Sequence, residues 1–244
     1  MGLYSRWKRR QSATTPLGIL GSNCKFWIDR ALSPVTYGTG TNVQQVDDLS
    51  TLTHHAINTT ALGTQPTQAS AGAVFDFNGT TQFLDVADHA DLDFTTALVV
   101  GFKITPDVVT GNRCPLAKAP TTGGSWSFQT NSAAMRWHIG TAGSNFGEGG
   151  TMTAGAASYF LAIFDGGGAG NSTRMILRHN GSPLTLTFTG TIPNTLAVGT
   201  DVLRLGSFVG GAQFFDGKIS AAFAANVVPS AGQITSLETY LAAA

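Results

Sequence analysis

"VFDFNGTTQFLDVADHADLDFTTALVVGFKITPD", residues 74–107, is the stretch that decides the fold. Phe75 and Phe77 alternate with polar residues, so both rings point to one face of an expected strand. The Asn-Gly pair that follows allows the positive φ angle of a tight turn, after which Phe83 is expected to join the core. The apolar run at 96–104 is typical of a well-buried strand. The stretch thus predicts strands joined by a turn, an aspartate-rich loop and a long buried strand.

The rest of the chain repeats this pattern of short strands. Alternating or apolar runs recur roughly every 10–20 residues, with Gly, Asn and Asp between them. "SWSFQT" and "MRWHIG", residues 125–130 and 135–140, predict a hairpin with "TNSAA" in its loop. The Asn180-Gly181 pair in "HNGSP" is the strongest local hairpin signal. This spacing predicts an all-β fold, an antiparallel sandwich or barrel.

Only the C-terminal segment, "SAGQITSLETYLAA", has a helical pattern. Ser230 is a suitable N-cap, and Gln233 stands at the position that completes a capping box. Ile234, Leu237 and Leu241 share one face of the expected helix. We therefore expect a short, amphipathic C-terminal helix.

Composition and charge narrow the function classes. The 244 residues suit one large β domain or two small ones, only 11% are charged, and the formal net charge is zero. This composition is too apolar for disorder and lacks the basic excess of a nucleic-acid binder, so we expect no specific nucleic-acid partner. The first ten positions are an exception because they hold four of the 14 basic residues. We predict an extended arm at 1–22 and a sandwich domain at 23–244, the arm being either a partner-binding segment or a solvated terminus.

The cysteines and the hydropathy pattern bear on disulfides, zinc sites and membrane spans. The two cysteines, Cys24 and Cys114, lie far apart, and their spacing leaves open whether they pair. No CxxC pair or Cys/His cluster predicts a zinc site. An apolar run of 18 residues is also absent, so we expect no transmembrane helix and no membrane partner, and no standard secretion signal is visible.

The order of these pieces resembles a known family. The run 74–107 is similar to the opening of laminin-G-like or concanavalin A-like jelly-roll domains, and "VLRLGSFVGGAQFFDGKISAAFAANVVPSAGQITSLETYL", residues 202–241, is similar to their end. Upstream, "FWIDRALSPVT" and "VQQVDDLSTLTHHAINTTALGTQPT" resemble a lead-in of phage and bacterial members, with Val46 in place of an aromatic residue and Thr51 in place of a glycine. The resemblance covers residues 24–241 and implies a two-sheet antiparallel jelly roll.

The aspartates near the opening stretch allow two interpretations. Asp88, Asp91 and Asp93 fall in the loop before the buried strand, where aspartates commonly bond their own backbone in turns. The alternative is a calcium site, because carboxylates from one loop supply part of a shell of about six to eight oxygens. The segment does not match an EF-hand loop. Calcium is the one cofactor left open, and no other is expected.

Catalytic motifs are missing. Glycosidases on this sandwich resemble one another in a Glu-x-Asp-x-x-Glu strand, but the chain has only two glutamates, Glu148 and Glu238, and neither belongs to such a motif. Asp165 at the end of "SYFLAIFD" opens a glycine-rich loop without the lysine of a P-loop. His54 and His55 point to opposite faces if extended, which is poor geometry for a metal. We therefore expect no enzyme, with a glycan hydrolase or lyase as the least favoured alternative.

Binding is the remaining class. Sugar recognition uses aromatic platforms and planar polar groups, which a region at 121–150 supplies. Its alternating strands also leave open that at least one indole belongs to the core. The candidate glycan-binding residues are Trp126, Trp137, His138, Asn145 and Phe146.

The phage-like lead-in favours a virion role. We expect a non-enzymatic structural protein on the virion surface, such as a capsid decoration, head spike or tail fibre, that forms a homo-oligomer and also grips host polysaccharide. The alternative is a free bacterial lectin-like module, extracellular or on the cell surface. The arm is expected to anchor the chain to other virion proteins. Its anchoring residues are Tyr4, Arg6, Trp7, Lys8, Arg9 and Arg10.

Overall fold

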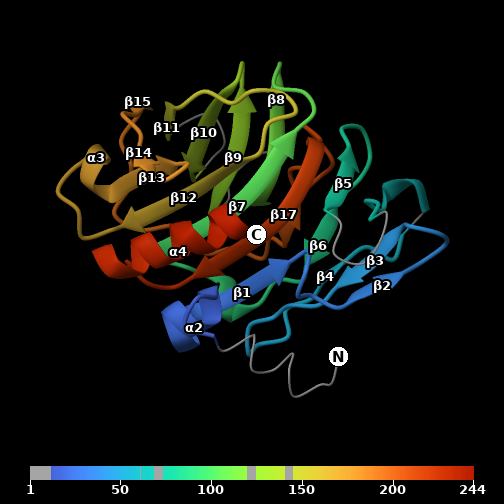
Figure 1. Ribbon diagram of the computed structural model, residues 1–244. Coiled ribbons are helices and arrows are strands. Elements are labelled where there is room, and N and C mark those ends of the chain that lie inside the picture. The colour runs from blue at the N-terminus through green and yellow to red at the C-terminus, as the bar shows by residue number, and fades with distance from the viewer. Residues whose placement is uncertain (1–11, 61, 69–73, 120–124, 141–144) are drawn as a thin grey trace.

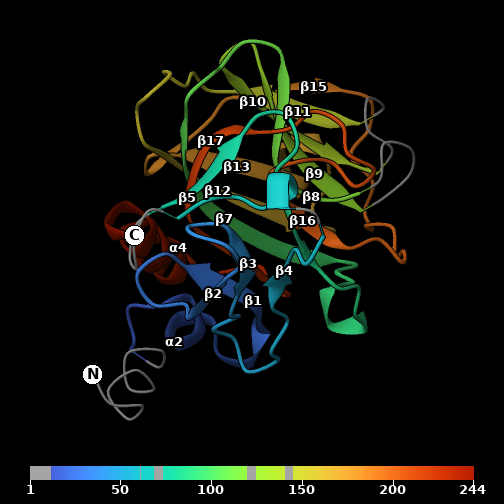
Figure 2. The same cartoon turned by 90° about the vertical axis from the view of Figure 1, so that its right-hand side faces the viewer.

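The computed structural model describes residues 12–244, except 61, 69–73, 120–124 and 141–144. Within these residues the chain forms two sheets packed face to face, and neighbouring strands pair antiparallel throughout (Figures 1 and 2). The predicted two-sheet antiparallel sandwich is confirmed.

The seven-stranded sheet joins the N-terminal strand to the C-terminal part of the chain. Its order is β1-β17-β7-β12-β13-β14, and β5 pairs with β17 beside this path. The long strand expected at 96–104 is its central member, β7. The strands are β1 (Cys24–Asp29), β5 (Phe75–Asn78), β7 (Ala97–Pro106), β12 (Ser158–Asp165), β13 (Met175–His179), β14 (Ser182–Pro183) and β17 (Asp216–Ala225).

The ten-stranded sheet has the order β15-β11-β10-β9-β8-β16-β6-β4-β3-β2. The lead-in similar to phage and bacterial domains contributes β1 to the other sheet and the edge strands β2 to β4 to this one. The strands are β2 (Val35–Tyr37), β3 (Val43–Val46), β4 (Ala56–Ile57), β6 (Leu84–Val86), β8 (Asn112–Lys118), β9 (Trp126–Asn131), β10 (Ala134–Ile139), β11 (Phe146–Gly149), β15 (Thr187–Thr189) and β16 (Leu203–Leu205).

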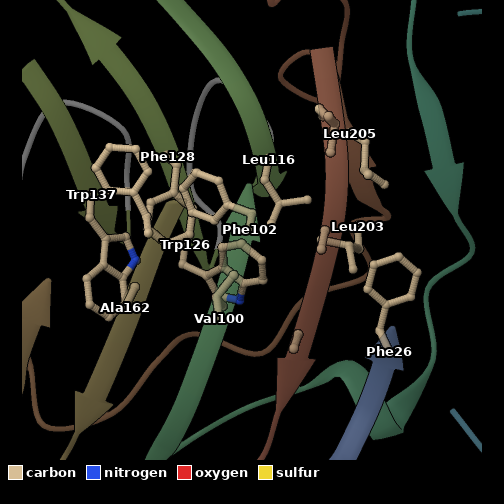
Figure 3. Close-up of a cluster of buried hydrophobic side chains, with 14 of the residues drawn as sticks. Phe26, Val100, Phe102, Leu116, Trp126, Phe128, Trp137, Ala162, Leu203 and Leu205 are labelled. Atoms are coloured by element: carbon tan, nitrogen blue, oxygen red, sulfur yellow. The ribbon is translucent and has the colours of Figure 1, made fainter. Parts of the chain in front are cut away.

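The main core lies between the two sheets (Figure 3). Phe75 and Phe77 are buried on the same face of β5, as their spacing predicts. Phe102 of one sheet meets Phe128 of the other with ring centroids 4.8 Å apart. Trp137 stacks on Phe128 at 5.4 Å. The first contact packs the two sheets against each other, and the second extends the aromatic cluster along the ten-stranded sheet.

A second apolar cluster covers the outer face of the seven-stranded sheet. Helix α4 (Ala231–Ala243) lies across β7 and β12, with α2 (Pro16–Leu20) beside it (Figure 1). The predicted capping box of α4 is present. The Ser230 side chain accepts from the backbone N–H of Gln233, and the Gln233 side chain accepts from the backbone N–H of Ser230. Leu237 and Leu241 are fully buried against the sheet. The expected C-terminal helix is confirmed.

Part of the segment expected as an arm has regular structure. Residues 16–22 of the expected arm lie in α2 and in the 3-10 turn η1 (Gly21–Asn23). Leu17 and Leu20 are buried in the second cluster with Trp27, so this segment belongs to the domain. The expected anchoring residues Tyr4, Arg6, Trp7, Lys8, Arg9 and Arg10 lie outside the described residues.

Local signals for turns and cysteines have clear outcomes. Ser132 and Ala133 adopt positive φ (47° and 73°) between β9 and β10, and Asn180 does so (48°) between β13 and β14, so both hairpins are confirmed. Cys24 and Cys114 are buried free thiols, and burial raises the pKa of each. None of the helices in the described residues has the length and apolar character needed to cross a bilayer.

Candidate functional site

The outer face of the ten-stranded sheet carries a continuous row of side chains. Because side chains alternate along a strand, residues between core positions point away from the sandwich, and their cross-strand partners do the same. The row crosses seven strands and mixes aromatic, charged and small residues. In order it comprises Phe146, His138, Ser127, Ala117, Arg204, Asp85 and Ile57.

The middle of this row is covered by the hairpin at 206–214. Phe208 of the hairpin is 1% exposed and packs with Cys114, Ala117 and Ala119 on the sheet. The hairpin therefore divides the outer face into two parts, which we name the β9–β11 half and the β6–β16 half.

The β9–β11 half places planar polar groups beside an aromatic ring. The Arg136 guanidinium lies 4.3 Å from the Phe146 ring centroid and donates to Glu148 Oε2 at 2.7 Å. Asn131 Nδ2 donates to the same oxygen at 2.8 Å. Phe146, Arg136 and Glu148 are all partly exposed. A partly exposed ring with a guanidinium over it and a carboxylate and an amide nearby can bind a ligand with one apolar and several hydroxyl-bearing faces.

His138 supports this ring from below. It is 1% exposed, its Nε2 lies 3.1 Å from Gln129 Oε1, and its ring centroid lies 5.0 Å from that of Phe146. Burial, followed by the neighbouring Arg136 charge, lowers its pKa to about 4 against the opposing effect of Glu148. His138 is therefore neutral at pH 7 and is a positioning residue for Phe146.

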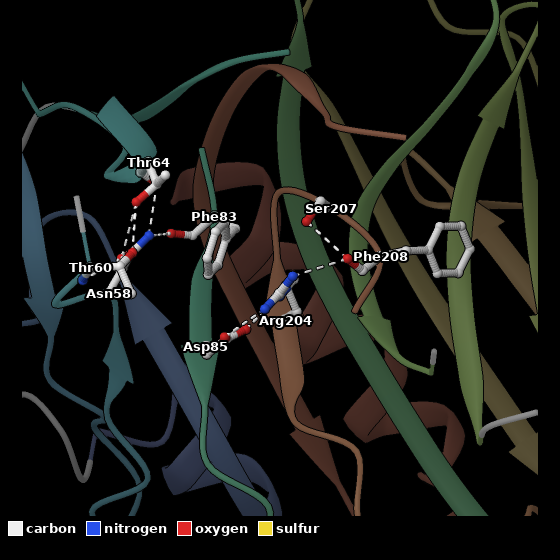
Figure 4. Close-up of polar contacts among 8 residues, drawn as sticks. All are labelled: Asn58, Thr60, Thr64, Phe83, Asp85, Arg204, Ser207 and Phe208. Atoms are coloured by element: carbon white, nitrogen blue, oxygen red, sulfur yellow. Dashed lines mark hydrogen bonds and ion pairs between the residues drawn. The ribbon is translucent and has the colours of Figure 1, made fainter. Parts of the chain in front are cut away.

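The β6–β16 half is built around an ion pair (Figure 4). Arg204 binds Asp85 through both carboxylate oxygens, with Nε–Oδ1 and Nη2–Oδ2 distances of 2.6 and 2.7 Å. The guanidinium also lies 4.0 Å from the Phe83 ring centroid and donates to the Phe208 carbonyl at 3.2 Å. Phe83, which the sequence placed in the core, instead lies half-buried under Arg204. The pair fixes the hairpin to the sheet, so this half has a structural role.

The structure corrects part of the predicted glycan-binding set. Trp126 and Trp137 are fully buried in the core between the sheets and have no surface on which a sugar can stack (Figure 3). Period-two alternation puts them on the inner face of β9 and β10, opposite to His138. Asn145 and Phe146 keep partial exposure, and the Asn145 carbonyl accepts from the Ile139 backbone N–H.

Arg136, Glu148 and Asn131 were missed by the sequence reasoning. The available signal was the spacing of Arg136 and His138, two residues apart and therefore on one face of a strand. The position of Glu148 opposite Arg136 depends on the β10–β11 register, which no local motif specifies.

The aspartates of the opening stretch have three different partners. Asp88 and Asp93 lie 2.7 and 3.4 Å from the Nζ atom of Lys118, whose side chain is almost fully buried. Asp85 belongs to the Arg204 pair. The three carboxylates of the calcium alternative, at positions 88, 91 and 93, therefore have different partners and do not form one ligand set. A lysine ammonium occupies the place between two of them.

Asp91 instead meets two histidines. Among the described residues, His54, His89 and Asp91 are the group of three whose ligand atoms lie near enough to hold one metal ion. Burial lowers the pKa of His54, against the opposing effect of Asp48. His55 points elsewhere, with Nδ1 3.5 Å from Asp47 Oδ1, so the adjacent histidines do not act together.

Comparison with known proteins identifies a fold. No protein family matches the sequence, and no curated protein matches it either. The structure is similar to Trypanosoma rangeli sialidase in complex with sialic acid, with a TM-score of 0.63 and 10% identity over 96% of this chain and 37% of that one. It is also similar to domain 4 of the extracellular GH43 arabinanase AbnA from Geobacillus stearothermophilus, in complex with arabinotriose (TM-score 0.51, 16% identity, 71% of this chain and 80% of that one).

A third similar structure is the binding domain of Paraclostridial Mosquitocidal Protein 1, with a TM-score of 0.59 and 9% identity over 90% of this chain and 52% of that one. The identities are low throughout. The shared feature is the fold. This chain spans 37% of the sialidase, so only a part of that protein corresponds to it.

Proposed function

We propose that the chain is a carbohydrate-binding β-sandwich without hydrolase activity, and that its β9–β11 half contacts the sugar. The observation that carries this proposal is the partly exposed Phe146 ring beside the fixed Arg136–Glu148–Asn131 group. An aromatic face binds the C–H surface of a sugar ring, and charged planar groups bind its hydroxyls with directional hydrogen bonds.

The similar structures support a sugar ligand. Domain 4 of the arabinanase is in complex with arabinotriose, and the match covers 71% of this chain and 80% of that domain. The sialidase holds sialic acid, but this chain corresponds to 37% of it. These structures therefore support sugar binding by a β-sandwich, but they do not identify the sugar that this chain binds.

The absence of hydrolysis is also part of the proposal. Most retaining hydrolases use two carboxyl groups about 5–5.5 Å apart, one of which gives up a proton to the leaving group. Both glutamates of this chain are bound to arginines, Glu148 to Arg136 at 2.7 Å and Glu238 to Arg178 at 2.7 Å. Glu148 lies in β11 of the ten-stranded sheet and Glu238 lies in α4 on the outer face of the seven-stranded sheet, so the two glutamates do not form such a pair.

A finer version places this module on a phage virion. It rests on the lead-in at 26–67 that resembles phage and bacterial members and on the basic residues at 6–10. In this version the basic residues anchor the chain to an acidic surface of other virion proteins, while the β9–β11 half faces host polysaccharide. A free bacterial lectin-like module uses the same sugar-binding half without the anchor.

A glycan array with the purified full-length chain tests sugar binding. We expect retention of at least one glycan class, and Phe146→Ala is expected to weaken that binding by about tenfold or more. Ile57→Ala is the matched control, because Ile57 is 36% exposed at the far end of the same row. Equal loss in both variants, or no glycan bound by the unmodified chain, contradicts the proposal.

Hydrolysis is tested on the polysaccharides that the array identifies. We expect no release of reducing ends by the unmodified chain. Release that is abolished in Glu148→Gln and retained in Glu238→Gln identifies a hydrolase instead.

The virion version is tested on particles purified from a lysate by gradient centrifugation. The full-length chain is expected to remain with the particles, and a chain without residues 1–10 is expected to be absent from them. The truncated chain must unfold at the same temperature as the full chain for this comparison. Equal incorporation removes the anchoring role, and absence of both chains favours the free module.

A further inference from the structure

Two segments far apart in the sequence bring His54, His89 and Asp91 together. His54 Nε2 lies 3.9 Å from Asp91 Oδ2, and His89 Nδ1 lies 3.0 Å from the same oxygen. The two imidazole ring centroids are 4.7 Å apart. One ligand atom from each residue lies within 4.8 Å of the other two.

The His54 side of the cluster is fixed by a buried carboxylate. Asp48 is 2% exposed and accepts hydrogen bonds from the backbone N–H groups of Trp27, Ser50 and His54, each at 2.9 Å. The loop that carries His54 is thereby tied to strand β1 of the other sheet. The backbone of His54 is therefore fixed before any metal binds. A site that is already ordered loses less conformational entropy when it binds its ligand.

The other side of the cluster is a short 3-10 turn, η3 (Ala90–Leu92). Leu92 is fully buried and anchors the turn in the main core. His89 caps the turn by accepting from the Asp91 backbone N–H at 3.2 Å. The cap places the His89 ring directly beside the Asp91 carboxylate.

One ring nitrogen in the cluster lacks a hydrogen-bond partner. His54 Nε2 is buried, and no donor or acceptor satisfies it. This nitrogen faces the Asp91 carboxylate and the His89 ring, so it is available to a ligand that binds all three side chains.

We propose that His54, His89 and Asp91 bind a divalent transition-metal ion, with zinc as its representative. Two imidazole nitrogens and one carboxylate oxygen are a zinc-type donor set, whereas calcium takes about six to eight oxygens. Ligand bonds of about 2.0–2.2 Å to zinc place ligand atoms roughly 3.3–3.5 Å apart. The separations from Asp91 Oδ2 to His89 Nδ1 and to His54 Nε2, 3.0 and 3.9 Å, lie on either side of this value. A metal bound at His89 Nδ1 takes the lone pair that now accepts the Asp91 backbone N–H, so binding replaces that hydrogen bond.

The site is open to solvent on one side. The side chains of His89 and Asp91 are 55% and 35% exposed, while that of His54 is 11% exposed. A metal enters from solvent, and its fourth position is left for water or for an external ligand. Lys25 Nζ lies 4.0 Å from the other Asp91 oxygen, Oδ1, and its charge opposes the metal without occupying the same oxygen.

Zinc titration of the untagged full-length chain, first stripped with a chelator, tests the proposal by calorimetry. We expect one saturable site, and a cobalt(II) absorption spectrum of low coordination number in the same chain. His54→Gln, His89→Gln and Asp91→Asn are each expected to weaken zinc binding by more than the roughly 10–100-fold that loss of a supporting contact causes. Calcium at millimolar concentration is expected to leave the titration unchanged.

His179→Gln is the matched control. The Nε2 atom of His179 is also buried without a hydrogen-bond partner, but His179 stacks on Phe160 outside the cluster. The control is expected to bind zinc as the unmodified chain does. Zinc is also expected to raise the unfolding temperature of the control and not that of the three ligand variants, whose own transitions show that they fold.

Two results overturn the proposal: an unmodified chain without a saturable zinc site, and ligand variants that bind zinc as tightly as His179→Gln. The outcome is independent of sugar binding, because Phe146→Ala leaves the three ligands in place. A chain that binds zinc and no glycan loses the proposed function and keeps the metal site.

Discussion

The outer faces of the two sheets differ in what their strands present. On the seven-stranded sheet the outward residues include Val99, Leu161, Ile163 and Phe223, and α2 and α4 cover them. On the ten-stranded sheet the outward row is largely polar or charged, and the 206–214 hairpin covers only its middle. Both faces belong to antiparallel strands around one core.

The difference shows how outward residues decide which face stays available. Apolar outward residues are stabilised only when another element removes them from water, so that face is used for the fold. Arginine–carboxylate pairs on the other face keep contact with solvent, so that face can exchange water for a ligand. The fold itself therefore leaves part of the outer face of the ten-stranded sheet uncovered, and the proposed sugar contact lies there.

Replacing one phenylalanine on each face gives the largest expected contrast. Phe223→Ala removes a fully buried ring under α4 and is expected to lower the free energy of unfolding by about 3–5 kcal/mol. Phe146→Ala removes a partly exposed ring and is expected to cost about 1 kcal/mol or less. Urea unfolding at pH 7 measures both, and equal losses contradict the assignment of one face to stability.

Acid is expected to lower the free energy of unfolding through protonation of His138 on the ten-stranded sheet. Its folded pKa of about 4 lies below the unfolded value near 6.5, so the stability it contributes is complete above pH 6.5 and is lost as the pH falls toward 4. Between pH 7 and pH 4.5 this loss amounts to roughly 2 kcal/mol.

His138→Gln removes the titrating group and tests this effect. The difference in unfolding free energy between the unmodified chain and the variant is expected to change by that amount across the same pH range. A difference that stays constant shows that His138 is not held neutral by burial.

The ion pairs of the molecule allow a smaller comparison. Asp85→Asn leaves the Arg204 guanidinium, 9% exposed, without its carboxylate, and is expected to cost about 1–2 kcal/mol. Lys218→Met breaks a solvent-exposed pair with Asp107 and is expected to cost at most about 1 kcal/mol. Reversed magnitudes in chemical denaturation contradict the role of Arg204 in fixing the hairpin.

The smallest effect on stability is expected from Glu148→Gln. The Arg136–Glu148 pair is partly exposed, so its loss is expected to change the unfolding free energy by less than about 1 kcal/mol. Its expected effect on sugar binding is larger, about tenfold, because a charged acceptor is lost. A variant that binds the array ligand unchanged limits the contact to Phe146 and Arg136.

The sequence by itself determined the local features of this protein. Alternation predicted the buried face of β5, the Asn-Gly pairs predicted turns, and Ser230 with Gln233 predicted the start of α4. These signals act between residues a few positions apart, so their physical cause is contained in the segment that shows them. The recurring local pattern indicated an antiparallel sandwich or barrel, and the resemblance to jelly-roll domains implied two sheets.

The tertiary structure alone decided which side chains meet. Lys118 faces Asp88 and Asp93, Asp91 faces His54 and His89, and Leu17 and Leu20 join α4, because strand order and register bring distant segments together. Trp126 and Trp137 were misassigned for the same reason, since alternation distinguishes two faces and only the second sheet decides which one is inside. Charge pairing and metal geometry depend on distances in space, and the sequence contains those distances only through the complete fold.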